Sequence, residues 1–187
     1  MKKNSGFSLV ELIIVIAIMA ILAAAILPAL IHYIDKAKKS DDIAAADGIA
    51  TSFEACIAND DYSAAISNIQ RTGTGNIDCL LISTEGDTGW TNYTTLSGTS
   101  NDDTDTIDDL ISELNQTCPP PALKYRKSVN PQNVPAGYIL GSGSYDANGW
   151  AVAINSKGEI CVFITDGTKS NAVKGVSVNP IKCSEYK

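Results

Sequence analysis

A single carboxylate interrupts the apolar segment near the start of this chain. Glu11 precedes residues 12–27, which carry no polar side chain. A charge at membrane depth costs up to about 3.5 kcal/mol, so the carboxylate favours a cationic partner. Cleavage after Gly6 would give Phe7 a new α-amine, four positions from Glu11 and on the same helix face. The spacing indicates an ion pair between an N-terminus and a carboxylate. The alternative is an interfacial Glu11 without a role.

The segment that carries Glu11 is long enough to cross a membrane. Residues 7–31 are broken only by Ser8, Glu11 and Pro28. As a helix rising 1.5 Å per residue they extend ~37 Å, which exceeds the ~30 Å hydrocarbon core of a bilayer. Pro28 removes one helix hydrogen bond and predicts a kink.

Two other interpretations of this segment remain open. Lys2 and Lys3 followed by an apolar stretch are also typical of a secretory signal peptide, which would be cut near Ala23–Ala25. The length of the stretch and the charge of Glu11 are unusual for such a peptide. A plain membrane anchor explains the length but gives Glu11 no purpose.

The residues from Lys2-Lys3 through Gly6-Phe7-Ser8-Leu9-Val10-Glu11-Leu12 closely resemble the leader and cleavage site of type IV prepilins and type II secretion pseudopilins. The resemblance covers about residues 1–58. It implies that a prepilin peptidase cuts after Gly6 and methylates Phe7, and that Glu11 pairs with a neighbouring subunit's N-terminus during assembly. Pro28 stands where this family usually has a helix-kinking proline. Ser8 replaces the more usual threonine.

The pattern beyond the membrane segment predicts an α+β protein. Ala45, Ile49, Phe53 and Ile57 recur every four residues, as on one face of an amphipathic helix. With the resemblance, this predicts the type IV pilin fold, in which a long N-terminal helix packs on a small antiparallel C-terminal sheet. The expected parts are a leader, a transmembrane or filament-core helix, the amphipathic half of that helix and an extracytoplasmic globular domain, at residues 1–6, 7–31, 32–58 and 59–187.

Within the globular domain the clearest signal is a hairpin. Residues 150–155 and 159–165 are apolar runs on either side of a turn at residues 156–158, and residues 138–140 indicate a further strand. Short helices are expected at residues 62–69 and 107–114, and residues 71–121 otherwise indicate loops. The acidic residues at 101–105 favour a solvated loop or helix cap over a calcium site, since the spacing of an EF-hand is missing.

Five cysteines lie beyond the apolar segment, at positions 56, 79, 118, 161 and 183, and none shows C-x-x-C spacing. Sequence alone does not select among their pairings. The resemblance implies a disulfide between Cys161 and Cys183, because many pilins tie a C-terminal loop to a sheet strand. A second bridge, Cys79–Cys118 or Cys56–Cys79, is a weaker expectation. The alternative is that all five remain reduced.

The composition argues against several classes of function. The formal charge of −7 disfavours phosphate-backbone binding, so the basic stretch at residues 124–127 indicates no clear nucleic-acid site. Neither a nucleophile elbow nor a dinucleotide fingerprint is complete. We therefore expect no enzyme activity, cofactor or metal.

The resemblance implies a structural subunit of a type IV pilus, which supports adhesion, motility or DNA uptake through the assembled fibre. A pseudopilin of a type II secretion system and a membrane-anchored extracytoplasmic binding domain are the alternatives. The implied partners are other pilin subunits, packed helix to helix, the prepilin peptidase, the pilus assembly machinery and, before assembly, membrane lipid. The implied location is the inner or cytoplasmic membrane as a single-pass precursor, and then an extracellular pilus or the cell surface.

Overall fold

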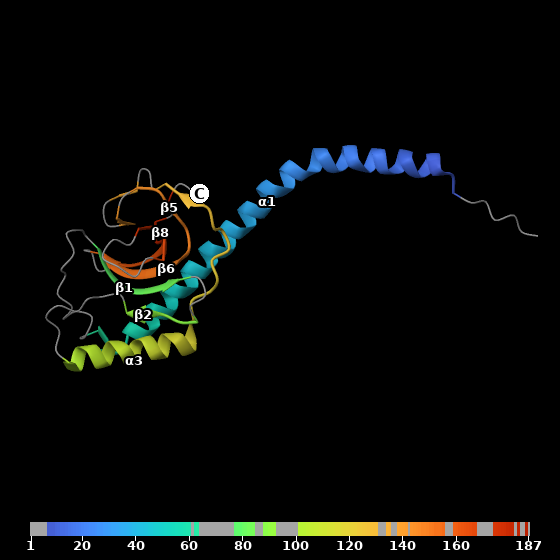
Figure 1. Ribbon diagram of the computed structural model, residues 1–187. Helices are drawn as coiled ribbons and strands as arrows, with labels where there is room; N and C mark the ends of the chain where they lie inside the picture. The colour runs from blue at the N-terminus through green and yellow to red at the C-terminus, as the bar shows by residue number, and fades with distance from the viewer. Residues whose placement is uncertain are drawn as a thin grey trace, which may run out of the picture. The chain divides into compact units, whose positions relative to one another are not determined.

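The computed structural model describes residues 7–60, 62–63, 77–84, 88–92, 101–130, 134–135, 138–141, 143–155, 159–167, 174–181, 183 and 186. The chain divides into two compact units, residues 1–38 and residues 39–187. Helix α1 belongs to both units, whereas every strand and the second long helix, α3, belong to the C-terminal unit (Figure 1).

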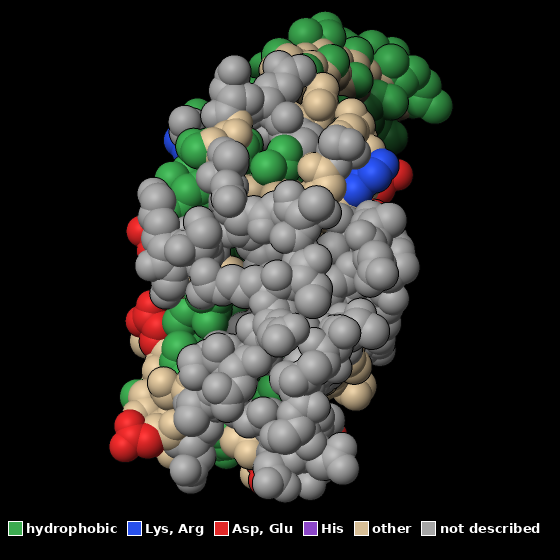
Figure 2. Space-filling view, turned by 90° about the vertical axis from the view of Figure 1, so that its left-hand side faces the viewer, with side chains coloured by type: hydrophobic (Ala, Val, Ile, Leu, Met, Phe, Trp, Pro, Cys, Tyr) green, Lys and Arg blue, Asp and Glu red, His purple; other side chains and the backbone are tan. Residues whose placement is uncertain are grey.

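Helix α1 (Leu9–Ile57) confirms the single long helix expected over residues 7–58. Pro28 lies inside it, and residues on both sides of the proline remain helical. In the N-terminal unit the large apolar side chains of α1 are exposed, and Figure 2 shows hydrophobic side chains of this segment uncovered in green. This stretch is long and apolar enough to cross a membrane, and none of its most apolar window is buried.

The C-terminal unit contains an antiparallel sheet of six strands in the order β2-β1-β6-β7-β8-β4. Two further strands, β3 and β5, pair with each other. The strands are β1 (Ile77–Thr84), β2 (Thr91–Asn92), β3 (Ser128–Val129), β4 (Ile139–Leu140), β5 (Tyr145–Asp146), β6 (Gly149–Asn155), β7 (Ile160–Thr165) and β8 (Gly175–Asn179). The long helix followed by an antiparallel sheet confirms the expected α+β type IV pilin fold.

The β6–β7 hairpin confirms the strand prediction from the apolar runs. Trp150 pairs with Ile164, and Ile154 pairs with Ile160. The turn expected at residues 156–158 lies outside the described residues. Alternation along these strands sends successive side chains to opposite faces of the sheet.

The described part of the region expected to be mostly loop contains strands β1 and β2 and a longer helix than expected. Strand β1 lies between β2 and β6, so it is interior to the sheet. Helix α3 (Asn101–Thr117) begins well before the short helix expected at residues 107–114. It is held by Ile107, Leu110 and Leu114, which recur at helical spacing and are all buried.

The acidic run at residues 101–105 forms the first turns of α3, where negative charge complements the helix dipole. Across the described residues, no three histidine, cysteine, aspartate or glutamate side chains are placed to hold a metal ion. The helix expected at residues 62–69 lies mostly outside the described residues.

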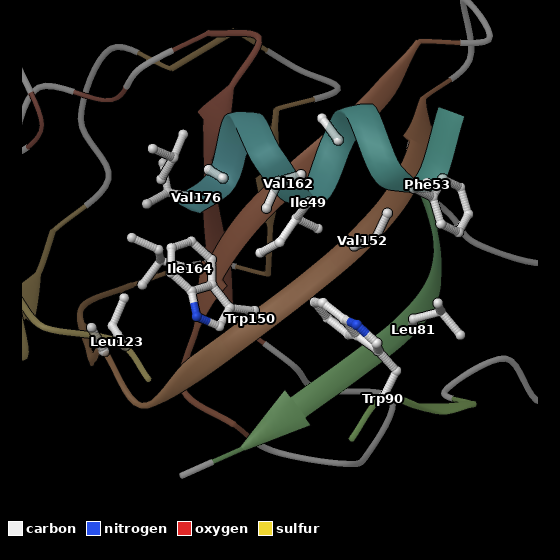
Figure 3. Packing of buried hydrophobic residues seen from close by; sticks show 14 of the residues in the cluster. Ile49, Phe53, Leu81, Trp90, Leu123, Trp150, Val152, Val162, Ile164 and Val176 are labelled. Atoms are coloured by element: carbon white, nitrogen blue, oxygen red, sulfur yellow. The ribbon is translucent and has the colours of Figure 1, made fainter. Parts of the chain in front are cut away.

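One face of the sheet carries the main core. Ile49 and Phe53 of α1 pack with Trp90 and Val152 in a single hydrophobic cluster (Figure 3). The buried side chains of α3 belong to the same cluster. The opposite face carries a smaller cluster, formed by Tyr138, Leu140, Ala151, Ala153, Cys161 and Phe163. The amphipathic half of α1 is therefore anchored to the sheet by the face that its four-residue spacing predicts.

We expect Phe53→Ala to destabilise the C-terminal unit by about 3–5 kcal/mol. Phe53 is 1% exposed, so its removal leaves a cavity as well as losing buried apolar area. Thermal unfolding followed by the fluorescence of Trp90 and Trp150 measures the change. The adjacent Glu54 is exposed, so Glu54→Ala serves as the control and should change the stability by less than about 0.5 kcal/mol. Equal stabilities for the two variants would contradict this account of the core.

A buried carboxylate joins α1 to a distant part of the same unit. Asp42 is 1% exposed. The backbone N–H groups of Lys124 and Tyr125 donate to its two oxygens at 2.9 and 2.8 Å, and the Tyr186 hydroxyl donates to it at 3.3 Å. Burial raises the pKa of Asp42, although these hydrogen bonds oppose the shift. Asp42 therefore ties the chain around residue 125 and the C-terminal Tyr186 to the helix.

Candidate functional site

The start of α1 is closed by a reciprocal pair of hydrogen bonds between Ser8 and Glu11. The Ser8 N–H donates to Glu11 Oε2 at 2.9 Å, and the Val10 N–H donates to Ser8 Oγ at 3.4 Å. Because α1 begins at Leu9, Ser8 is the N-cap and Glu11 is the third helical residue. This arrangement is a capping box, in which both side chains satisfy backbone donors that the helix leaves open.

The capping box gives Glu11 a local role that the sequence reasoning missed. The signal was present, since Ser8-Leu9-Val10-Glu11 has the S-x-x-E pattern before an apolar run. One oxygen of the carboxylate is engaged by the Ser8 N–H, and the side chain remains exposed. An exposed carboxylate of this kind retains capacity for a second, cationic donor.

Of the other two residues predicted to act at the N-terminus, the structure describes Phe7 but not Gly6. Gly6 lies outside the described residues, as does the rest of the leader. Phe7 immediately precedes the N-cap, and its side chain is 77% exposed. The structure places Phe7 and Glu11 within one turn of the same chain end, while cleavage after Gly6, methylation of Phe7 and the assembly role of Glu11 remain predictions.

The surface around Glu11 is almost entirely apolar. The side chains from Leu9 to Ile34 include many large hydrophobic groups that are 45–73% exposed. Water does not favour such a surface, because each exposed apolar group forgoes about 25 cal/mol per Å² that burial would recover. This part of α1 therefore requires either lipid or other helices around it.

The two cysteines of one expected disulfide belong to different hydrophobic clusters. Cys161 packs with Phe163 on one face of the sheet, whereas Cys183 packs with Val162 and Ile164 on the other. Cys161 and its neighbour Val162 point to opposite faces, because side chains alternate along a strand. Both cysteines are in the thiol form in this structure, and the expected Cys161–Cys183 bridge stays a prediction.

Cys161 behaves as a buried apolar residue. Burial raises the pKa of its thiol to about 12, and the negative charge of Glu159 adds to the shift. The thiol is therefore protonated at neutral pH and a poor nucleophile. The side chain of Cys79 lies outside the described residues, so the two weaker expectations that involve it stay predictions.

Comparison with known proteins agrees with the features of the N-terminus. Residues 1–27 match the family described as the prokaryotic N-terminal methylation motif. The chain is 52% identical over 52 residues to a fimbrial protein of Moraxella nonliquefaciens, a match that covers 28% of this chain and 34% of the relative. It is 39% identical over 89 residues to prepilin peptidase-dependent protein A of Clostridium perfringens, which covers 47% of this chain and 62% of the relative.

The chain thus spans about a third of the first relative and about three fifths of the second. No solved structure matches it. The family match covers the N-terminal methylation motif, and the described part of that motif lies at the start of a long apolar helix, which an antiparallel sheet follows in the chain. The N-terminal part of the chain is accordingly similar to that of type IV pilin-like proteins, the group that comprises type IV pilins and type II secretion pseudopilins.

Proposed function

We propose that the chain is a structural subunit of a type IV pilus filament. The observation that carries this proposal is an exposed apolar helix whose first turn holds a single carboxylate, within a matched N-terminal methylation motif. In the membrane, lipid covers this helix. In the filament, the helices of neighbouring subunits replace the lipid, and the C-terminal sheet forms the outer surface.

The same features support a set of partners for the proposed subunit. The prepilin peptidase cuts after Gly6 and methylates Phe7, and the assembly machinery moves the subunit out of the membrane. Copies of the chain then pack helix to helix, with alanines such as Ala20 and Ala24 allowing close approach. The relative named for its dependence on prepilin peptidase supports the first of these steps. The subunit acts as a building block without catalysis, and adhesion, motility or DNA uptake belongs to the assembled fibre.

A pseudopilin of a type II secretion system is the second candidate, because the same motif and helix serve both kinds of filament. Electron microscopy of cells that produce the chain separates the two. Extracellular fibres labelled by an antibody to the C-terminal unit would support the pilus, whereas short filaments confined to the cell envelope would support the pseudopilus. The fimbrial name of one relative favours the pilus.

Processing gives the most direct test of the N-terminal site. We expect the mature chain to begin at an N-methylated Phe7 and Gly6→Val to leave an uncut precursor in the membrane, because a branched side chain replaces the small residue before the cut. Intact-mass analysis of the membrane fraction measures both forms.

Gly48→Val is the matched control for this experiment. Gly48 is exposed on α1, and a Cβ there meets no other atom within 4 Å. The same chemical change at Gly48 should therefore leave processing complete. A mature chain that starts among Ala23–Ala25, or normal cleavage of Gly6→Val, would contradict the prepilin interpretation.

A further inference from the structure

Two cysteines that are far apart in sequence stand at the ends of the two long helices. Cys56 lies in the last turn of α1, and Cys118 directly follows α3. The Cys118 N–H donates to the carbonyl of Leu114 at 2.8 Å, so this residue continues the helical turn. Both cysteines belong to, or pack against, the main hydrophobic cluster.

The helix faces that carry these cysteines are directed at each other. Phe53 precedes Cys56 by three positions and Leu114 precedes Cys118 by four, so each pair shares a helix face. Phe53, Leu114 and Cys118 line the same small apolar cavity. Just beyond α1, the Tyr62 hydroxyl donates to Glu113 at 3.0 Å, which ties the chain to the same turn of α3.

The surroundings of the two thiols differ. Cys56 is buried, and burial and the charge of Glu113 raise its pKa, while a hydrogen bond with the Thr117 side chain lowers it. Cys118 contributes a smaller electrostatic effect that also raises the pKa of Cys56, and it is itself half-buried. Both thiols are free in this structure. The more accessible Cys118 can therefore meet an external reagent before the buried Cys56 does.

We propose that Cys56 and Cys118 are a disulfide site that bonds α1 to α3 after the C-terminal unit leaves the cytosol. The oxidant is a disulfide, either of a protein or of a small molecule. The Cys118 thiolate attacks one sulfur of that disulfide and releases one donor thiol. Cys56 then loses its proton to solvent and attacks the Cys118 sulfur, which releases the second donor thiol. Two cysteine thiols are oxidised to one disulfide, and the donor disulfide is reduced to two thiols.

The bridge would link elements that so far meet only through side-chain packing and single hydrogen bonds. The Trp90 Nε1–H donates to the Cys118 carbonyl at 2.8 Å, so the strand β2 region is already joined to the end of α3. A covalent link to Cys56 therefore ties β2 and α3 together to α1. This role goes beyond filament formation, because it requires only an oxidising compartment.

The test uses the purified full chain in detergent, incubated with oxidised glutathione. Remaining thiols are alkylated under denaturing conditions, and non-reducing peptide mapping identifies the bridges. We expect a peptide that joins Cys56 to Cys118. Alkylation of both Cys56 and Cys118 would overturn the proposal, as would a bridge from either of them to Cys79 or Cys183.

A stability measurement separates a formed bridge from mere proximity. Oxidation should raise the melting temperature of the unmodified chain by about 5 °C or more, because the link closes a long loop of the unfolded chain. Cys56→Ser and Cys118→Ser should each abolish this rise. Since each variant is compared with and without glutathione, a lower baseline stability does not obscure the result. A rise that persists in both variants would overturn the assignment.

Discussion

Replacing Glu11 with alanine should stop filament assembly and leave membrane insertion intact. Insertion should be unchanged or improved, because a charge has been removed from an apolar helix. Assembly should fail because the α-amine of a neighbouring Phe7 loses its carboxylate in a low-dielectric filament core. Breaking a buried ion pair costs about 3–5 kcal/mol, and about 1.4 kcal/mol corresponds to a factor of ten. We expect sheared filament to fall by about a hundredfold or more, measured against membrane-bound subunit by immunoblot.

The capping box complicates this variant, and Glu11→Gln resolves the complication. Alanine removes both the charge and the acceptor of the Ser8 N–H. Glutamine has nearly the same shape and is the other residue that completes a capping box, so only the charge is lost. If assembly depends on the ion pair, Glu11→Gln should fail as Glu11→Ala does.

Each outcome of the glutamine experiment is informative. Normal filaments from Glu11→Gln would show that the carboxylate acts through the helix cap alone and would contradict the ion pair. Ser8→Ala tests the cap from the other side, since it removes the acceptor of the Val10 N–H and leaves the charge of Glu11. We expect Ser8→Ala to weaken the helix start by about 1 kcal/mol and to permit assembly.

The parts of the fold that sequence predicted are those with local, periodic signals. The four-residue recurrence that includes Ile49 and Phe53 indicated which face of α1 is buried, and those two side chains pack into the main core. The hairpin of β6 and β7 was equally clear, because its apolar runs flank a turn signal. Such patterns depend only on residues that are close in sequence, so they can be recognised without knowledge of tertiary contacts.

The elements that sequence missed have weak or interrupted local patterns. Strand β1 carries an irregularity between Cys79 and Leu81, which breaks the two-residue alternation of its side chains. The first turns of α3 contain Asn and Asp residues, which favour turns because their side chains compete for backbone hydrogen bonds. Burial of Ile107, Leu110 and Leu114 against the sheet side of the core stabilises that helix as a whole.

Cysteine pairing and the role of Asp42 are hard to predict for a different reason, because both depend on long-range geometry. The Cys161–Cys183 expectation followed from the resemblance and took no account of which sheet face each residue occupies. In the sequence alone, nothing distinguishes Asp42 from an ordinary solvent-facing aspartate of an amphipathic helix. Its partners Lys124 and Tyr125 lie 82 and 83 positions away, and no local pattern in the sequence connects them.

Asp42→Ala should be among the most destabilising changes in the C-terminal unit. The substitution leaves two backbone N–H groups without their acceptor in a buried site, and the Tyr186 hydroxyl keeps only the Tyr125 carbonyl, at 3.4 Å. An unsatisfied buried polar group costs about 1–3 kcal/mol, so we expect a loss of about 3–5 kcal/mol in the free energy of unfolding. Fluorescence of Trp90 and Trp150 during urea unfolding of the full chain in detergent measures it.

Asp41→Ala is the control for the loss of charge. Asp41 is adjacent in sequence and forms a 2.8 Å ion pair with Lys124, but both side chains are 56% exposed. Exposed ion pairs contribute about 0–1 kcal/mol, so Asp41→Ala should have a small effect. Similar losses from the two variants would show that burial and the hydrogen bonds of Asp42 do not set the stability.

The raised pKa of Asp42 predicts the direction in which the stability of the fold changes with pH. Burial raises the pKa of Asp42 above the value of 3.8 that it has when unfolded, so the folded state binds the proton more tightly. The stability that follows from this is fully present below pH 3.8 and is lost as the pH rises through the folded pKa. Asp42→Asn cannot titrate at this position, and comparing it with the unmodified chain cancels the other carboxylates. From pH 3.5 to 7, the stability of the unmodified chain relative to Asp42→Asn should fall. A relative stability that rises over this range would mean that the hydrogen bonds from Lys124, Tyr125 and Tyr186 outweigh burial and hold the carboxylate ionised.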